Sequence, residues 1–364
     1  MAKSSLHDGR LENGNREHLL DILERRASDT PDIIAYTFLK DGQDIDGTYT
    51  YAQLDLHARS IAKRFGSNAQ NERALLIYPP GVEFMAGFYG SMYSGAIPIP
   101  APPPDPTRLK RTLPRLKSII DDARAKYILT TRAMMDAMTG VDAEALQELS
   151  ELEWIITDEV PAEEGIGWEI SHRKEYNDIA YLQYTSGSTS TPKGVMVTYG
   201  NVVHNCEHIT TGFGYDSNCV MVTWMPYFHD YGLIDGLTAP LFHGFPCYIL
   251  SPLTFIRRPE RWLQAIHTFR GTHTQAPNFA YELCVSKIDD KILGGLDLSS
   301  MITFSSGGEH IRVDTVKAFT KKFAACGLKP EAVCPAYGLA EGTLVVSAKT
   351  PSGTACFLDI DSDA

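Results

Sequence analysis

The sequence reads Thr185-Ser-Gly-Ser-Thr-Ser-Thr-Pro-Lys-Gly194 between two segments with strand-like patterns, residues 179–185 and 195–199. Small hydroxyl side chains and backbone N–H groups of such a loop can converge on phosphate oxygens, and Lys193 adds a positive charge. The loop is not a Walker A motif, because Pro192 and Gly194 stand where that motif has a glycine and a hydroxyl residue. The loop therefore predicts a phosphate site, with a Ser/Thr-rich surface turn as the alternative.

Strand and helix patterns alternate on both sides of this loop. Thr50 and Gln53 form a predicted capping box, and Pro259 and Gly271 bracket a helix. Residues 41–47 are predicted to form a turn, Asn201 to cap the helix after residues 195–199, and residues 313–323 to form a further helix that Gly327 closes. This alternation predicts an α/β fold of layered, mostly parallel sheets covered by helices. The predicted divisions are a flexible terminus (1–16), a first α/β subdomain (17–178), a second that carries the phosphate loop (179–349) and a short end segment (350–364).

Composition excludes several classes of protein. The 364 residues include 33 Lys plus Arg and 45 Asp plus Glu, a net charge of −12, which disfavours nucleic acid and anionic membranes as partners. Seven cysteines without a CxxC pair, and a polar start without an apolar leader, favour the cytoplasm. Residues 84–104 lack charge, but their prolines and glycines argue against a membrane span.

A basic segment follows the proline-rich loop at residues 98–106. Arg108, Lys110, Arg111, Arg115 and Lys117 fall on one predicted helix. The segment is either a solvated helix face or a docking patch for an acidic partner.

Further motifs accompany the phosphate loop. They are Ile77-Tyr-Pro-Pro-Gly-Val-Glu-Phe84, Arg111-Thr-Leu-Pro-Arg115, Trp224-Met-Pro-Tyr-Phe-His-Asp-Tyr-Gly-Leu233, Ala276-Pro-Asn-Phe-Ala-Tyr281 and Tyr337-Gly-Leu-Ala-Glu341. With Tyr184-Thr-Ser-Gly-Ser-Thr189 and Pro192-Lys-Gly194, they resemble the adenylate-forming superfamily, and within it the fatty acyl-AMP ligases. The resemblance runs from about residue 17 to residue 364 and implies the fold of the large N-terminal domain of such an enzyme.

The resemblance implies a ligase that converts a fatty acid and ATP to acyl-AMP and pyrophosphate with Mg²⁺, then passes the acyl group to a phosphopantetheinylated acyl carrier protein. The phosphates and Mg²⁺ would be held by Thr185, Ser186, Gly187, Ser188, Thr189, Lys193 and Glu341, with Thr185 and Glu341 on the metal. The rest of the nucleotide would contact Ser306, Gly307, Gly308, Glu309, Tyr337 and Gly338. The acyl site would include Trp224, Tyr227, His229, Asp230 and Phe279, although the aromatic residues alone are equally compatible with a core. His229, Glu341 and Lys193 would be the catalytic residues.

Several features depart from the family pattern. Ser190 and Asp235 stand where glycine is usual, and the family's C-terminal domain with its transition-state lysine does not occur in this sequence. We therefore expect a fragment of the large domain that is weakly active or inactive by itself. Two alternatives stay open, an acyl-CoA synthetase and a non-catalytic module that binds nucleotide or acyl groups. A zinc site on His204, Cys206 and His208 is disfavoured, because Cys206 would point to another helix face.

Overall fold

The computed structural model describes residues 16–105, 108–139, 149–185 and 192–358. The chain forms two compact units: unit 1 comprises residues 1–33, 49–79 and 83–204, and unit 2 comprises residues 34–48, 80–82 and 205–364. The sequence division at 178/179 thus falls inside unit 1, and an early segment, residues 34–48, belongs to unit 2.

Unit 1 contains a parallel sheet of four strands in the order β4-β3-β5-β6. Its strands are β3 (Arg73–Leu76), β4 (Ile97–Pro100), β5 (Tyr127–Thr130) and β6 (Glu153–Ile156). A separate antiparallel pair consists of β7 (Ile179–Thr185) and β8 (Lys193–Thr198), which flank the predicted phosphate loop. Every residue of β4 and β5 is buried, as expected for parallel strands covered on both faces.

Two helices of unit 1, α1 (Leu19–Asp29) and α2 (Tyr51–Arg64), begin with a capping box. The predicted capping box of α2 is confirmed: Gln53 N–H donates to Thr50 Oγ1 at 3.3 Å, and Thr50 N–H donates to Gln53 Oε1 at 2.9 Å. Further helices are α3 (Glu83–Tyr93), α4 (Leu109–Ala123) and α5 (Arg132–Thr139). The buried face of α4 contributes Leu113, Leu116 and Ile119 to a cluster that also includes Tyr184.

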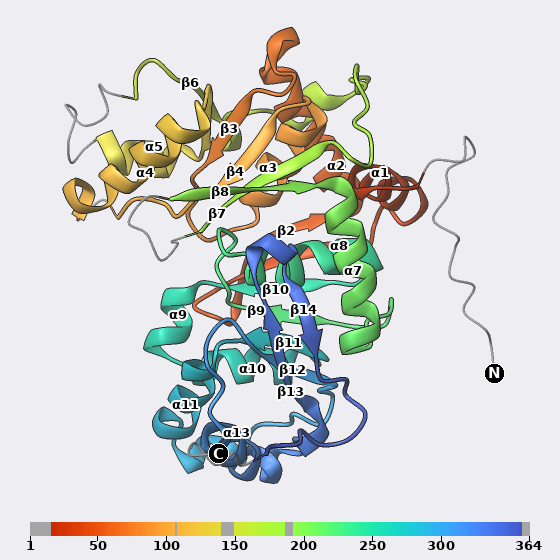
Figure 1. Ribbon diagram of the computed structural model, residues 1–364, viewed down its shortest axis with the longest axis vertical. Coiled ribbons are helices and arrows are strands. Elements are labelled where there is room, and N and C mark those ends of the chain that lie inside the picture. Colours follow the sequence, from red (N-terminus) through yellow and green to blue (C-terminus); the bar gives the residue numbers. More distant parts are fainter. Residues whose placement is uncertain (1–15, 106–107, 140–148, 186–191, 359–364) are drawn as a thin grey trace, which may run out of the picture. The chain divides into compact units, whose positions relative to one another are not determined.

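Unit 2 contains a sheet of eight strands in the order β14-β13-β12-β11-β9-β10-β1-β2 (Figure 1). The strands from β13 to β1 pair in parallel, and β14 pairs with β13 in the antiparallel direction. Their bounds are β1 (Ile34–Lys40), β2 (Asp44–Thr50), β9 (Met221–Thr223), β10 (Cys247–Leu250), β11 (His273–Ala276), β12 (Thr303–Ser306), β13 (Val333–Gly338) and β14 (Val345–Ala348). The predicted α/β class and the mostly parallel sheets are confirmed.

The helices of unit 2 pack an aromatic core around Trp262, which is fully buried. Its ring contacts those of Trp224, Phe255 and Phe304. The helices are α7 (Tyr199–Phe213), which begins in unit 1, a π-helical segment η5 (Tyr231–Thr238), α8 (Ala239–His243), α9 (Pro252–Arg257), α10 (Glu260–Thr268), α11 (Asn278–Lys287), α12 (Asp290–Leu293) and α13 (Val313–Phe323).

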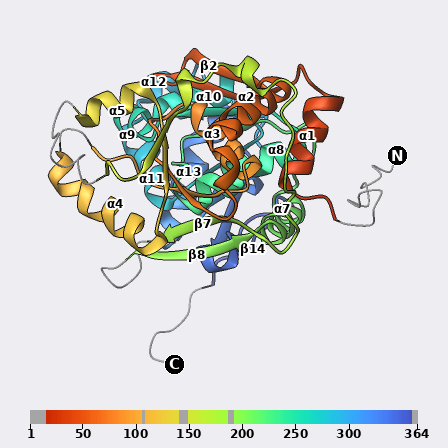
Figure 2. The same cartoon turned by 90° about the horizontal axis from the view of Figure 1, so that it is seen from above.

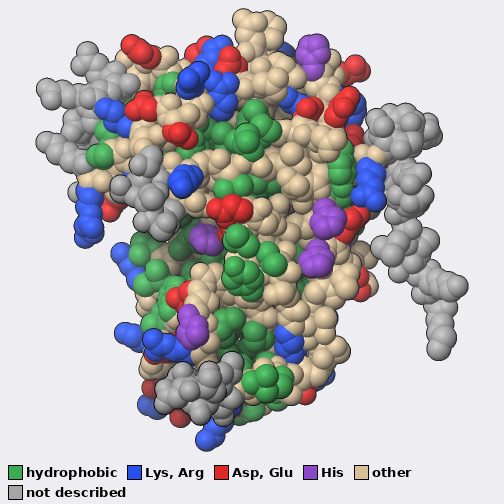
Figure 3. Space-filling model, viewed as in Figure 1, with side chains coloured by type: hydrophobic (Ala, Val, Ile, Leu, Met, Phe, Trp, Pro, Cys, Tyr) green, Lys and Arg blue, Asp and Glu red, His purple; other side chains and the backbone are tan. Residues whose placement is uncertain are grey.

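Two further observations concern the distribution of charge on the surface and the lengths of the helices. Acidic, basic and apolar side chains are interspersed on the face seen in Figure 3. Within the described ranges, no helix combines the length and the apolar character needed to cross a bilayer.

Two local predictions were wrong. Residues 41–47 were expected as a turn, but β2 begins at Asp44 and forms the edge of the eight-stranded sheet. Asn201 was expected to cap α7, but it lies inside the first turn. Asn201 N–H donates to Thr198 Oγ1 at 3.1 Å, and Asn201 Oδ1 accepts from Thr198 N–H at 3.0 Å. The reciprocal bonds make Thr198 the capping residue, because its side chain accepts the N–H from inside the helix.

Candidate active site

Four neighbouring strands of unit 2 end at one edge of the sheet. β13, β12, β11 and β9 are consecutive in the sheet order and run in parallel, so their carboxyl ends lie together. In open α/β sheets, ligands bind outside this edge. The last residues of these strands and the segments that follow them carry residues predicted for the acyl and nucleotide sites, among them Trp224, Phe279, Ser306 to Glu309, and Tyr337.

A pocket with a volume of about 190 Å³ lies at this edge. It joins residues that the sequence assigned to two different ligands, since His229 and Asp230 from the acyl set line it together with Gly307, Gly308, Tyr337 and Gly338 from the nucleotide set. Its remaining lining residues are Tyr231, Ala336, Leu339, Leu344 and Val345. Unit 2 therefore brings the acyl and nucleotide candidates into one cavity.

The backbone of this pocket leaves no room for side chains at two glycines. A Cβ atom at Gly338 would lie 1.9 Å from the carbonyl oxygen of Leu344, and one at Gly307 would lie 3.0 Å from that of Ala336. Gly308 has φ +77°, the left-handed region that favours glycine. Tyr337 leaves 62 % of its surface exposed beside them. An exposed ring next to bare backbone fits a flat aromatic ligand such as adenine.

Ser306 and Glu309 have different surroundings. The Ser306 hydroxyl is buried and has no hydrogen-bond partner among the described residues, and Ser306 does not belong to the residues that line the pocket. The Glu309 carboxylate instead accepts the N–H of Phe279 at 2.6 Å, in the first turn of α11. A carboxylate there stabilises the helix N-terminus, and this bond ties the segment after β12 to α11.

His229 and Asp230 form a contact pair at the start of η5. His229 Nδ1 lies 2.7 Å from Asp230 Oδ1, and the same oxygen accepts the N–H of Tyr231 at 2.7 Å. The His229 side chain is half exposed, while Asp230 is buried. Because Asp230 holds the imidazole through Nδ1, Nε2 is the ring atom left for a ligand.

The aromatic acyl candidates are mostly packed against other rings. Trp224 is buried and stacks on Phe255, with ring centroids 4.0 Å apart. Tyr227 is also buried and meets the edge of Phe228. Phe279 touches Trp224 but keeps 42 % of its surface exposed, so it has the freest ring of the three.

Glu341 lies in a tight turn between β13 and β14. Its carboxylate is exposed, and no ion pair engages it within the described ranges. Thr343 in this turn has φ 71° and ψ −53°, a strained conformation for a β-branched residue. Such strain persists only where the surroundings impose it.

Asn205 holds part of the turn between β13 and β14 in place. This residue was not singled out from the sequence. The buried Asn205 amide donates to the carbonyls of Gly342 at 3.2 Å and Val345 at 3.1 Å, and its oxygen accepts the N–H of Val345 at 3.1 Å. A single asparagine in an ordinary helical sequence carries no signal for this contact. Tyr231 was likewise missed, although its hydroxyl bonds Ser305 and its ring lies beside Gly308.

The phosphate-loop candidates belong to unit 1. Thr185 ends β7 and Lys193 begins β8, and the two residues pair directly across the ladder. The Lys193 side chain is exposed. A Cβ atom at Gly194 would lie 2.9 Å from the Tyr184 ring, so glycine is required there. Ser186, Gly187, Ser188, Thr189 and Ser190 lie outside the described residues.

Metal binding by side chains alone finds no support among the described residues. No group of three or more His, Cys, Asp or Glu within those ranges could hold an ion. Cys206 is buried while His204 and His208 are exposed, so these three do not share one side of α7. The exposed Glu341 carboxylate offers a hard oxygen ligand that suits Mg²⁺, with phosphate oxygens as the natural remaining ligands.

Asp235, the departure from the family glycine, is a buried acid in η5. Its side chain is fully buried, and Oδ1 accepts the hydroxyl of Tyr215 at 2.7 Å. Oδ2 has no hydrogen-bond partner within the described part of the chain. Burial raises the pKa of this carboxyl from its usual 3.8 to about 7, because the charged form is poorly solvated there.

Residues 23–358 match the family model described as AMP-binding enzyme, which covers most of the chain. The chain belongs to this family. Among relatives of this AMP-binding chain, the medium-chain fatty acid:acyl-carrier-protein ligase JamA of Moorena producens is 45 % identical over 349 residues, covering 95 % of this chain and 58 % of JamA. The long-chain fatty acid:AMP ligase FadD26 of Mycobacterium marinum is 35 % identical over 346 residues, covering 92 % of this chain and 58 % of FadD26.

The fold of the AMP-binding chain matches solved structures. A crystal structure of a fatty acyl-adenylate ligase from L. pneumophila, in complex with acyl adenylate and pyrophosphate, aligns with a TM-score of 0.85 and 33 % identity, covering 93 % of this chain and 58 % of that chain. The chain thus spans about 58 % of the length of these relatives. The sequence resemblance to fatty acyl-AMP ligases is confirmed.

Proposed function

We propose that this AMP-binding chain is the part of a fatty acyl-AMP ligase that binds ATP and the fatty acid, and that the whole protein loads a phosphopantetheinylated acyl carrier protein. The observation that carries this proposal is the 45 % identity to an acyl-carrier-protein ligase over 95 % of the chain. The shared pocket of His229, Asp230 and Tyr337 supports it, because acyl and nucleotide groups must meet for an acyl adenylate to form.

The proposed chemistry has two steps. A carboxylate oxygen of the fatty acid attacks the α-phosphorus of ATP, the bond from that phosphorus to the bridging oxygen breaks, and pyrophosphate leaves with the electron pair. The carrier thiol then attacks the acyl carbon, its proton passes to solvent, and AMP leaves. Both steps depend on orientation and charge neutralisation more than on covalent catalysis by the protein.

The residues of this chain take defined roles under the proposal. Tyr337 stacks on adenine, while Gly307 and Gly308 leave space for the ring. His229 binds the reacting carboxylate through Nε2, oriented by Asp230. Glu341 would hold Mg²⁺, with Thr185 also assigned to the ion, and the bound ion would neutralise phosphate charge.

In unit 1, Lys193 supplies a positive charge to the β- and γ-phosphates, and Ser186, Gly187, Ser188 and Thr189 are assigned to the same phosphates. We further propose that the protein is cytoplasmic, since all seven cysteines are free thiols.

The test supplies the full-length protein with ATP, Mg²⁺ and dodecanoate, and offers either coenzyme A or a carrier protein as acceptor. Mass spectrometry should find acyl-AMP and acyl carrier without appreciable acyl-CoA. Glu341→Ala should abolish pyrophosphate release, whereas Glu282→Ala, which removes an exposed carboxylate of α11, should leave it intact. Abundant acyl-CoA would make the protein an acyl-CoA synthetase, and no adenylate with any acid would make it a binding module.

A further inference from the structure

Three arginines follow one side of α4. Arg108, Arg111 and Arg115 are spaced by three and four residues, so they lie on the same helix face, and all three are exposed. We refer to them as the arginine stripe. Within the residues that the structure describes, no ion pair engages the side chains of Arg111 and Arg115. The stripe therefore presents positive charge that the described part of the chain does not neutralise.

The charged residues of α4 lie at the ends of the helix where the helix dipole disfavours them. A helix N-terminus favours acidic side chains and its C-terminus favours basic ones, each by about 0.3–1 kcal/mol. Helix α4 has Arg108 and Arg111 at its start and Asp121 and Asp122 in its last turn. Pro114 lies inside the helix, where it removes a backbone donor. The exposed face of α4 is thus not arranged for helix stability, and such departures are expected where a surface has another role.

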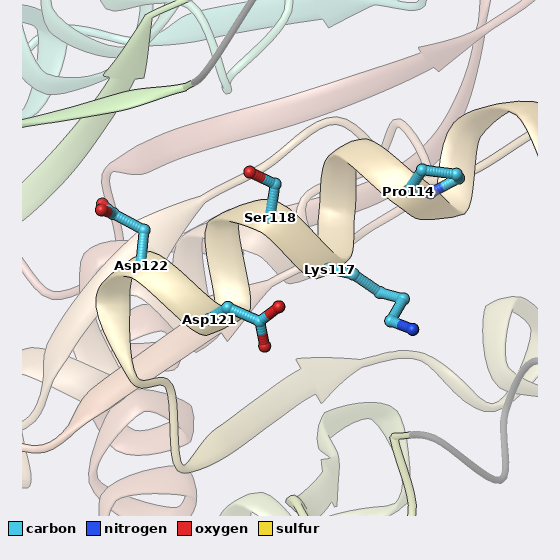
Figure 4. Close-up of a pocket in the computed structure, with 5 residues that line it drawn as sticks. All are labelled: Pro114, Lys117, Ser118, Asp121 and Asp122. Carbon is cyan, nitrogen blue, oxygen red and sulfur yellow. The ribbon is translucent and has the colours of Figure 1, made fainter.

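The stripe leads toward β7, the strand that precedes the predicted phosphate loop. Ser118 and Asp122 continue the spacing of Arg111 and Arg115, and Figure 4 shows these two side chains on one side of the helix, with Lys117 and Asp121 on the other. The Tyr184 hydroxyl donates to Asp122 Oδ2 at 2.5 Å, which bonds the last turn of α4 to β7. The ribbons of both elements are labelled in Figure 2. Tyr184 precedes the assigned phosphate residues by one position, so the helix that carries the stripe is bonded to the strand that enters the loop.

The exposed side of α4 carries a hollow beside the arginine stripe. Pro114, Lys117, Ser118, Asp121 and Asp122 line an open hollow of about 540 Å³ on the exposed side of α4. The hollow adjoins the stripe, since Pro114 and Ser118 flank Arg115 in the helix. A partner held by the arginines would therefore also contact this hollow.

We propose that the arginine stripe docks an acidic surface of the carrier protein that receives the acyl group. This inference rests on the proposed function, which requires a protein acceptor. The chain has a net charge of −12, so an acidic partner is repelled at long range unless a local basic surface steers it. Exposed charges at the edge of an interface act in this way, by raising the association rate and setting the orientation.

The experiment reverses the stripe in the full-length protein. Arg111→Glu/Arg115→Glu is compared with Arg257→Glu/Lys317→Glu, which changes the net charge equally at two exposed cations elsewhere, on α9 and α13. Acyl-AMP formation is measured without carrier, and the KM for carrier is measured at low and high salt. We expect the stripe variant to form acyl-AMP at the wild-type rate but to show a KM for carrier about tenfold higher at low salt. The control should keep the wild-type KM.

Folding defects are separable from docking defects. Glutamate at the start of α4 agrees with the helix dipole, so the melting temperature of the stripe variant should equal or exceed that of the wild type. A carrier protein with acidic surface residues changed to lysine should restore the KM of the stripe variant.

An unchanged KM for carrier in a variant that forms acyl-AMP normally would overturn the docking surface alone. A wild-type protein that forms no acyl-AMP would overturn the proposed function, and the docking surface with it. Loss of binding to anionic vesicles, with an unaltered KM for carrier, would assign the stripe to a membrane and refute the proposal.

Discussion

The buried carboxyl of Asp235 makes the stability of unit 2 depend on pH. Its folded-state pKa of about 7 lies above the usual 3.8, so between these values the folded protein keeps a proton that the unfolded chain has released. The stabilising effect is complete below about pH 4 and is lost as the pH rises to about 7. A difference of about three pKa units corresponds to about 4 kcal/mol in the free energy of unfolding.

Asp235→Asn removes this ionisation and keeps an oxygen for the Tyr215 hydroxyl. At pH 4 the variant should be less stable by about 1–3 kcal/mol, because its amide group is buried without an acceptor. Between pH 4 and pH 8 the difference between variant and wild type should move by about 4 kcal/mol in favour of the variant. Urea unfolding, followed by tryptophan fluorescence, measures this difference in the free energy of unfolding, since Trp224 and Trp262 are buried in unit 2. Because variant and wild type are compared at the same pH, the contributions of all other titrating groups to the free energy of unfolding cancel.

Tyr215→Phe provides the control. The Tyr215 hydrogen bond lowers the pKa of Asp235. Loss of this bond should therefore move the pH range in which stability falls to higher pH. A difference between wild type and Asp235→Asn that stays constant from pH 4 to pH 8 would refute the reasoning, because it would mean that Asp235 titrates equally in the folded and unfolded chain.

Three further variants test the site. Tyr184→Phe removes a hydrogen bond to the Asp122 carboxylate, and should lower the free energy of unfolding of unit 1 by about 2 kcal/mol in denaturant titrations; no loss would mean that the bond is unimportant. Lys193→Ala should raise the KM for ATP about tenfold or more and leave that for fatty acid nearly unchanged, whereas an unchanged KM for ATP would remove this lysine from the phosphate site. Gly308→Val adds a side chain at φ +77°, at a cost of about 1–2 kcal/mol, and should abolish binding of an acyl-AMP analogue in calorimetry with an intact circular dichroism spectrum. Normal affinity would contradict the assigned adenine pocket.

Local sequence signals predicted local structure well. The Thr50 capping box, the two strands beside the phosphate loop and helix α13 all follow from patterns within about ten residues. The residues of the pocket that were predicted for the nucleotide follow from the family resemblance, whereas Tyr231 was not singled out. Their roles on the ligands stay predictions.

Features that depend on distant partners could not be predicted. Asn205 acquires its role from a turn about 140 residues later in the chain. Residues 41–47 are rich in aspartate and glycine and were predicted to form a turn, and only the sheet edge makes β2 begin at Asp44. The π-helical segment η5 is an apolar run with no periodicity that distinguishes it from an ordinary helix.

The membership of β1 in unit 2 has a consequence for synthesis on the ribosome. Its partner β10 is translated about 200 residues later, because Tyr36 pairs with Cys247. At about 5–20 residues per second, β1 can pair with its neighbour β2 almost at once but waits roughly 10–40 s before it can pair with β10. Ribosome-bound chains that end before β10 should therefore be cleaved by protease at residues 34–40, and chains that expose all of β10 should be protected. Equal protection at both lengths would show that β1 finds another partner first. During this interval the nascent chain carries an unpaired strand edge. Such an edge makes the chain a substrate for chaperones, and slow translation at this stage favours aggregation.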